Sequence, residues 1–284
     1  RRSYTEDCAR ILAQFLPAGI DGSISTVPLG FKGFTQPPDF VARCVQELLG
    51  LARFLKRLHN ETGSLIRLAI EPEPFCVLET ISETRQFFAL LRQAAESAGL
   101  RDEVDEYIGV CFDVCHQAVE YEDISTCFRQ LGQDHIRINK LHITCALQLD
   151  NPAENLIARR ALAHYAEPRD LHQTIAPASS GGQLRWIDLT PEMALHPPDD
   201  FLNAESWRIH FHVPVNAEHV RPLSTTRPQL QQALREIPGL SYAPHLEVET
   251  YTWEVLPDAP QVSSADRLIH GLAEELKATR ALIA

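Results

Sequence analysis

The sequence lacks three features that would each place it in a broad class of proteins. It has no apolar run of about 18 residues and no signal-peptide pattern at its start, so nothing in it predicts a membrane span. It has no basic excess: 38 acidic residues against 26 Lys and Arg give a net charge of −12, which argues against broad nucleic-acid binding. No Gly-rich phosphate fingerprint follows any expected strand, which disfavours a dinucleotide-binding fold.

The cysteine pattern lacks the regularity of a disulfide framework. The seven cysteines are an odd number and lie mostly in apolar segments, as is typical of reduced, buried thiols in a cytoplasmic protein. Cys111 and Cys115 flank Asp113, but two cysteines alone do not make a zinc site, so we interpret them as buried thiols as well. The first residue is Arg1 rather than methionine, so Arg1 need not be the natural first residue.

Short apolar runs alternate with amphipathic helical patterns along most of the chain. Strands are expected at residues 22–29, 65–71, 107–113, 136–144, 207–213 and 245–253. Helices are expected at residues 3–16, 39–59, 80–98, 121–131, 152–165, 226–235 and 264–283. A β-hairpin around a Ser-Ser-Gly-Gly turn is expected as an insert near residues 172–189.

Alternating strand and helix units imply an α/β protein with a parallel sheet. The six units and a spare leading helix are what remains of an eight-fold (β/α)₈ barrel without its first strand, first helix and second strand. We therefore predict a single TIM-barrel domain over residues 1–284 that lacks those first elements. The alternative is an open doubly wound sheet.

Polar residues alternate with apolar residues in four of the expected strands. Because side chains swap faces at each residue of a strand, each polar set shares one face, and the apolar set should face the covering helices. The polar sets should then point into the barrel, whose active site lies at the C-terminal strand ends. Carboxylate and imidazole side chains near those ends predict a divalent metal site, with oxygens favouring Mn²⁺ or Mg²⁺ and imidazoles favouring Zn²⁺. The predicted metal ligands are Glu71, Asp113, His142, His212 and Glu249.

These candidates also have structural interpretations. Asp113 can cap a following helix, with His116 as a hydrogen-bonded turn histidine. Glu71 can pair with an arginine, and Glu247 competes with Glu249 for the ligand role. The strand histidines can equally be buried core residues held by their neighbours.

Other polar residues are candidate substrate contacts. Lys140 and His210 belong to the inward polar sets, and Lys32 lies in a Gly/Pro loop. Arg169 and His172 lie in the irregular segment after the expected helix 152–165, where a lid role is an alternative to loop packing.

Two strings in the sequence resemble the xylose-isomerase-like TIM-barrel superfamily, which holds sugar isomerases, ketose 3-epimerases and endonuclease IV. The string Gly-Val-Cys-Phe-Asp-Val-Cys-His at residues 109–116 is especially similar to endonuclease IV, in which this Asp and His bind zinc. The string Leu-Ala-Ile-Glu-Pro at residues 68–72 is more similar to the epimerases, in which this Glu binds the metal and acts on the substrate carbon.

A closer resemblance, over most of the chain, is to the barrel protein of the bacterial ebo metabolite-trafficking cluster. It is carried by several strings, among them Ser-Thr-Val-Pro-Leu-Gly-Phe-Lys at residues 25–32, Glu-Pro-Arg-Asp-Leu-His-Gln at 167–173 and Glu-Thr-Tyr-Thr-Trp at 249–253. This resemblance implies a sugar-phosphate-isomerase-like barrel that handles or exports a secondary-metabolite precursor.

The superfamily resemblance also implies roles for individual residues. Glu71 and Glu249 would be the general base and acid on either side of the metal, and His116 would contact the substrate or a second metal. His210 and His212 stand where endonuclease IV has an Asp-x-His pair, and the change at the first position argues against a trinuclear zinc site.

We therefore predict a metal-dependent sugar or polyol isomerase or epimerase that acts on a small molecule. One alternative is a non-catalytic metabolite-binding or traffic protein that uses the same pocket. Abasic-site DNA cleavage is a further alternative, disfavoured by the acidic charge. We expect a cytoplasmic protein without a nucleic-acid partner, and the sequence is compatible with a homodimer.

Overall fold

The computed structural model describes residues 2–217, 220–254 and 264–283. The described residues group into two compact units. The first unit is drawn from Arg1–Phe112, Thr126–Leu141 and Tyr242–Leu246, and the second from Asp113–Ser125, His142–Ser241 and Glu247–Ala284. The single domain predicted from the sequence stays a prediction.

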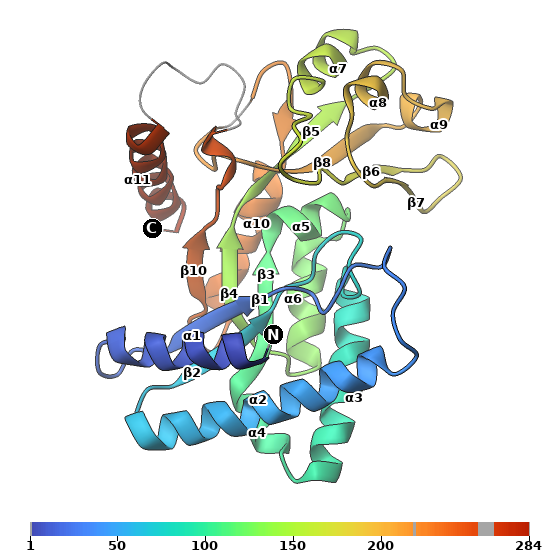
Figure 1. The fold of residues 1–284 in the computed structure, drawn as a ribbon. Helices are drawn as coiled ribbons and strands as arrows, with labels where there is room; N and C mark the ends of the chain where they lie inside the picture. The colour runs from blue at the N-terminus through green and yellow to red at the C-terminus, as the bar shows by residue number, and fades with distance from the viewer. Residues whose placement is uncertain (1, 218–219, 255–263, 284) are drawn as a thin grey trace. The chain divides into compact units, whose positions relative to one another are not determined.

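A parallel sheet forms the centre of the first unit, with the strand order β1-β2-β3-β4-β10 (Figure 1). Its strands are β1 (Gly22–Thr26), β2 (Ile66–Ile70), β3 (Ile108–Asp113), β4 (Ile138–Ile143) and β10 (His245–Val248). β2 pairs in parallel with β1 and with β3, and the arrows of β3 and β4 run the same way in Figure 1. Every residue of β2, β3 and β4 is buried, as expected of strands covered on both faces. The predicted α/β class is confirmed.

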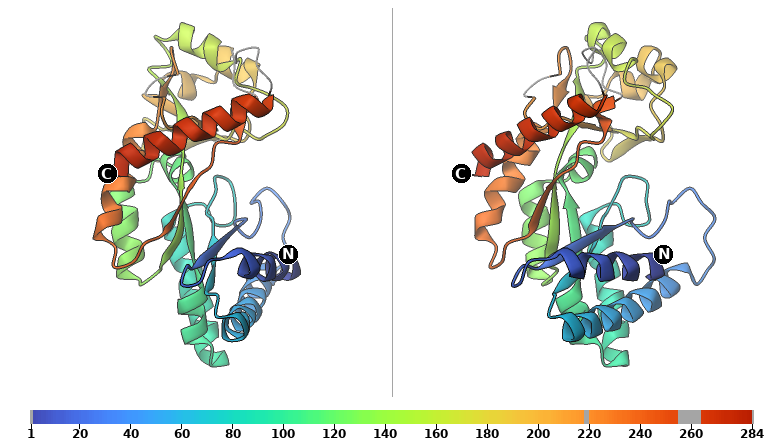
Figure 2. Two further views of the ribbon diagram at one scale, coloured as in Figure 1. Left: turned by 90° about the vertical axis from the view of Figure 1, so that its left-hand side faces the viewer. Right: turned by 60° about the vertical axis from the view of Figure 1, so that its left-hand side comes forward.

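The longer helices of the first unit are amphipathic, and α2 and α3 end at left-handed glycine caps. They are α1 (Arg2–Phe15), α2 (Phe40–Thr62), α3 (Ile81–Ala98), α4 (Arg101–Tyr107) and α6 (Ile124–Gln133). α1 and α2 lie side by side in both views of Figure 2. α3 begins with a capping box between Thr80 and Glu83 and ends at Gly99, whose φ of 64° is left-handed. α4 was not predicted.

Gly109 in β3 allows a close approach between chain segments. A Cβ at this position would overlap the backbone carbonyl oxygen of Arg137 and the side-chain amide of Asn139. Asn139 in turn donates from its Nδ2 to the carbonyl oxygen of Leu68, 2.7 Å away. The amide of Asn139 thus occupies the space that a side chain at Gly109 would need.

The second unit contains an antiparallel sheet with the strand order β7-β6-β8-β5-β9. Its strands are β5 (Cys145–Asp150), β6 (Thr174–Pro177), β7 (Gln183–Trp186), β8 (Ser206–Val213) and β9 (Ser224–Thr225). β6 and β7 form the hairpin predicted near residues 172–189. β5 follows β4 after the single residue Thr144 and was not predicted.

The prediction that residues 207–213 form a strand of the parallel barrel is wrong. This segment lies in β8, which pairs antiparallel with both β5 and β6. The alternation of side chains that predicted the strand is the same in a parallel and an antiparallel sheet, so it does not decide the direction of pairing. Because the parallel sheet of the described residues holds five strands, the eight-stranded barrel stays a prediction.

The helices of the second unit are mostly short. They are α5 (Val114–Val119), α7 (Leu156–Leu162), α8 (Pro191–Leu195), α9 (Asp199–Leu202), α10 (Arg227–Glu236) and α11 (Ser264–Ile283). Two 3₁₀ turns, η1 (Ile237–Gly239) and η2 (Thr252–Glu254), complete the elements, and η2 replaces the end of the strand predicted at residues 245–253. No helix among the described residues is long and apolar enough to cross a membrane.

Candidate metal centre

Asp113 is both the last residue of β3 and the N-cap of α5. Its Oδ1 accepts hydrogen bonds from the backbone N–H of His116 at 3.0 Å and from Oγ1 of Thr144 at 2.8 Å. The carboxylate is completely buried. The capping role proposed as an alternative is therefore real, but it engages only Oδ1, and Oδ2 faces Nδ1 of His142 at 3.2 Å.

A second carboxylate meets the same imidazole. Oε2 of Glu249, just beyond the end of β10, lies 2.8 Å from Nδ1 of His142. Ligand atoms of Asp113, His142 and Glu249 all lie within 4.8 Å of one another. Three of the five predicted metal ligands therefore lie together in the second unit.

The two carboxyls of this cluster titrate in opposite directions. Burial raises the pKa of Glu249, and the negative charge of Asp113 raises it further. Burial would also raise the pKa of Asp113, but the facing His116, His142 and His212 outweigh burial and hold that pKa well below its usual value. Asp113 therefore remains ionised, whereas Glu249 keeps its proton to a higher pH than an exposed glutamate does.

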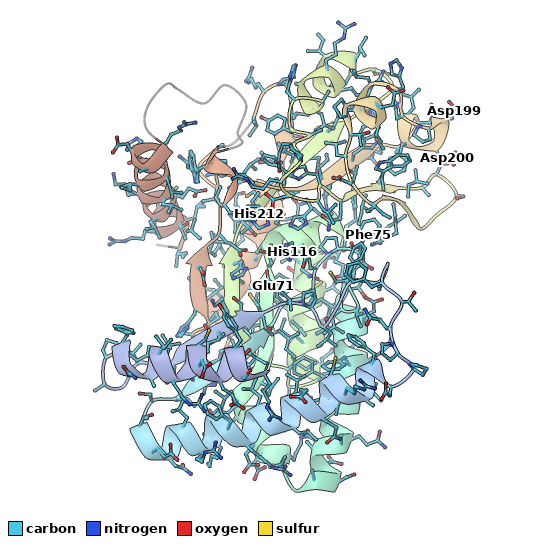
Figure 3. The ribbon with its side chains drawn as sticks, in the orientation of Figure 1. Glu71, Phe75, His116, Asp199, Asp200 and His212 are labelled. Carbon is cyan, nitrogen blue, oxygen red and sulfur yellow. The ribbon has the colours of Figure 1, made fainter. Side chains whose placement is uncertain are left out.

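Three further histidines bring their Nε2 atoms together (Figure 3, which labels His116 and His212). Nε2 of His210 lies 3.0 Å from Nε2 of His116 and 3.3 Å from Nε2 of His212. His116 belongs to α5, and the other two belong to β8, where their i, i+2 spacing places them on one face. Burial and the neighbouring His116 and His212 lower the pKa of His210 well below its usual value, so its imidazole is neutral.

The segment before β6 supports this histidine cluster. Oε1 of Gln173 lies 2.8 Å from Nδ1 of His210, and the backbone N–H of His210 donates to the carbonyl oxygen of Gln173. His172 is completely buried, with Nε2 at 3.1 Å from Oε1 of Glu167 and Nδ1 at 3.2 Å from the carbonyl oxygen of His210. His172, predicted to contact substrate, thus contacts the backbone of β8, and the neighbouring Arg169 is exposed.

The remaining predicted site residues belong to the first unit, and their roles stay predictions. Glu71 follows β2, and its backbone N–H donates to the carbonyl oxygen of Thr26. Lys32 makes ion pairs of 2.5 and 2.6 Å with carboxylate oxygens of Glu79 and Glu83. Nζ of buried Lys140 lies 3.4 Å from Oγ of Ser25.

Four residues that contact the side chains of these clusters had no predicted site role. Cys115 was interpreted only as a buried thiol, and Thr144, which shares a strand face with His142, was not a candidate. Gln173 could be found only from the tertiary fold, because it reaches β8 from the preceding loop. The fourth residue is Tyr251, whose ring centroid lies 4.7 Å from that of His212.

Comparison with known proteins assigns no family. No protein-family model matches the chain, and no curated protein matches it. A solved structure of the IolI protein with a binding zinc atom is 12% identical, with 99% of this chain and 68% of that chain covered and a TM-score of 0.44. These values are too low to support an argument about function, so the centre is interpreted from its own side chains.

The side chains of the cluster fit a divalent cation. Asp113 brings a buried carboxylate and Glu249 a partly exposed one to the same imidazole nitrogen, and like charges at such a distance repel unless a cation or a proton lies between them. Carboxylate oxygen and imidazole nitrogen are ligands that Mn²⁺ and Zn²⁺ share.

Proposed function

We propose that the protein is a metal-dependent isomerase or epimerase that acts on a small hydroxylated carbonyl compound, such as a sugar or the keto form of a polyol. The observation that carries this proposal is the meeting of the Asp113 and Glu249 carboxylates at Nδ1 of His142. Asp113, His142 and Glu249 would hold the ion. The sequence adds Glu71 as a fourth ligand.

The side chains of the cluster can divide the work of proton exchange. When bound, a divalent ion supplies Lewis-acid polarisation of neighbouring hydroxyl and carbonyl oxygens of the substrate. Because burial raises the pKa of Glu249, its carboxyl can take a proton from a carbon beside the carbonyl and return it. Asp113 stays ionised and, through Oδ1, holds the first turn of α5, which carries His116. His116 is the candidate for orienting a substrate hydroxyl.

A deuterium-exchange experiment tests the proposed reaction. A panel of ketoses and keto derivatives of cyclic polyols is incubated with the metal-loaded protein in deuterated water, and incorporation at carbon is followed by proton NMR. We expect exchange with the wild type and its loss in Glu249→Gln. Glu192→Gln is the control, because Glu192 is an exposed glutamate of the same unit that belongs to no group of metal-binding side chains among the described residues, and it should retain exchange.

Absence of exchange across the panel, with metal bound, would refute the catalytic proposal. Ligand that stays bound through native mass spectrometry without turnover would then favour a carrier for the same class of molecule. A role in the handling of secondary-metabolite precursors is proposed on the sequence resemblance alone. The chemical identity of a ligand that stays bound would test this role.

A further inference from the structure

A second group of metal-binding side chains lies in the second unit and shares no residue with the cluster of Asp113, His142 and Glu249. Cys115, His210 and His212 bring one ligand atom each to within 4.8 Å of one another. All three are buried, with exposed fractions of 0%, 5% and 1%. Their donors are a thiol and two imidazoles, without a carboxylate, so this group is chemically softer than the first.

The hydrogen-bond partners of His210 and His212 determine which nitrogen of each imidazole can bind a metal ion. Oε1 of Gln173 can only accept, so Nδ1 of His210, 2.8 Å away, carries the ring proton. Nδ1 of His212 lies 2.6 Å from the backbone carbonyl oxygen of Glu249 and must donate to it as well. In the neutral rings, both Nε2 atoms therefore present lone pairs. Metal-binding histidines are held in this way, with the second nitrogen donating to an oxygen.

The separation of these lone pairs matches a tetrahedral zinc site. With Zn–N bonds of about 2.0–2.1 Å and tetrahedral angles, two nitrogen ligands lie about 3.3–3.4 Å apart. The Nε2 atoms of His210 and His212 are 3.3 Å apart. Two lone pairs that face each other at this distance are favourable only if a proton or a cation lies between them or beside them. His116, whose Nε2 is 3.0 Å from that of His210, can supply such a proton when no metal is bound.

We propose that Cys115, His210 and His212 form a second cation site that takes Zn²⁺ through one Sγ and two Nε2 atoms. On binding, the Cys115 thiol loses its proton to solvent and coordinates as the thiolate. Cys115 is then a ligand, rather than the inert buried thiol that the sequence suggested. The proposal does not depend on the isomerase activity, because none of its three ligands belongs to the other cluster.

Cobalt substitution tests this site through the light absorption of a cobalt–thiolate bond. The full chain is stripped with a chelator and titrated with Co²⁺, and near-ultraviolet absorption from thiolate-to-cobalt charge transfer is recorded. We expect this band in the wild type and its loss in Cys115→Ser. Cys145→Ser is the matched control, because Cys145 is equally buried in the same unit and belongs to no group of metal-binding side chains among the described residues. It should keep the band.

Two further measurements keep the outcome decisive if Cys115→Ser folds poorly. Gln173→Leu removes only the partner of His210, and we expect Zn²⁺ affinity at the band-forming site to fall about 10- to 100-fold. Glu249→Gln, which alters the carboxylate cluster and keeps the backbone carbonyl oxygen that faces His212, should keep the band. Absence of the band in Co²⁺-loaded wild type, or its persistence in Cys115→Ser, would overturn the proposal. Neither result would bear on deuterium exchange, so the two proposals fail separately.

Discussion

Substitutions at Asp113 can separate its structural role from its predicted role as a metal ligand. Asn keeps an oxygen acceptor for the backbone N–H of His116 and the hydroxyl of Thr144, and Asn and Asp cap helices about equally well. We therefore expect metal-free Asp113→Asn to keep both hydrogen bonds and to lose, in free energy of unfolding, only the attraction between the carboxylate charge and the facing histidines. Asp113→Ala also removes a cap worth about 1 kcal/mol and leaves a buried hydroxyl without this acceptor, at about 1–3 kcal/mol. Its loss should therefore exceed that of Asp113→Asn by about 2–4 kcal/mol.

The affinity for a metal ion should fall sharply in Asp113→Asn even though this variant keeps its hydrogen bonds. Loss of an outer partner of a metal ligand costs about 10- to 100-fold in affinity, so loss of a ligating charge should cost at least about 100-fold, or about 2.8 kcal/mol. We expect Asp113→Asn to weaken Mn²⁺ binding by this amount although its fold is nearly intact. Mn²⁺ is the appropriate probe because it prefers oxygen ligands and therefore reports on the carboxylate cluster.

Urea unfolding of the chelator-treated proteins and calorimetric titration with Mn²⁺ measure the two effects. Equal destabilisation by Asn and Ala would show that the charge of Asp113 is itself structural. Wild-type Mn²⁺ affinity in Asp113→Asn would exclude this residue as a ligand and would refute the reasoning.

Three further predictions concern the stability of the fold. Glu120 is completely buried and paired with Arg185 of the hairpin at 3.0 Å, so Arg185→Leu should cost about 3 kcal/mol in urea unfolding, and adding Glu120→Gln should restore part of it. If the double variant is no more stable than Arg185→Leu, the buried charge is not the cause. Gly109→Ala, where a Cβ would overlap a backbone carbonyl oxygen, should lose about 1–3 kcal/mol, whereas the control Gly132→Ala has open space in a helix and should gain up to about 1 kcal/mol; equal effects of the two changes would contradict this packing argument. Burial raises the pKa of Glu275, so the stability that this group contributes is present below its unfolded pKa of about 4.3 and is lost as the pH rises through the raised folded value. Unfolding at pH 4 to 7 should therefore show the wild type losing stability relative to Glu275→Gln as the pH rises, and a constant difference would contradict this prediction.

The parallel strands and long helices could be predicted because their sequence signals are local. The expected strand at residues 65–71 and helix at residues 80–98 differ from β2 and α3 by a residue or so at each end. The apolar period and the capping pair Thr80 and Glu83 are both visible in the sequence.

The elements that were missed depend on partners far away in the chain. α5 is only six residues long and follows β3 without a loop, so its sequence resembles a turn, and the Asp113 cap that begins it was weighed against a metal role. β5 continues the apolar run of β4 across Thr144, and no local signal marks the change from one sheet to the other. Pairing with β8 makes residues 145–150 a separate strand of the antiparallel sheet. Because the paired residues lie about 60 positions apart in the chain, this pairing is a tertiary property.

The histidines of β8 were expected to lie together even though their sheet was assigned wrongly. The expectation rested on the two-residue period, which places His210 and His212 on one face in a parallel or an antiparallel strand alike. Which nitrogens the two rings present was beyond the sequence, because Gln173 and the carbonyl oxygen of Glu249 reach them from other segments. The alternation of side chains along a strand therefore predicts which residues share a face, while the surrounding fold decides the proton positions that allow them to bind a metal.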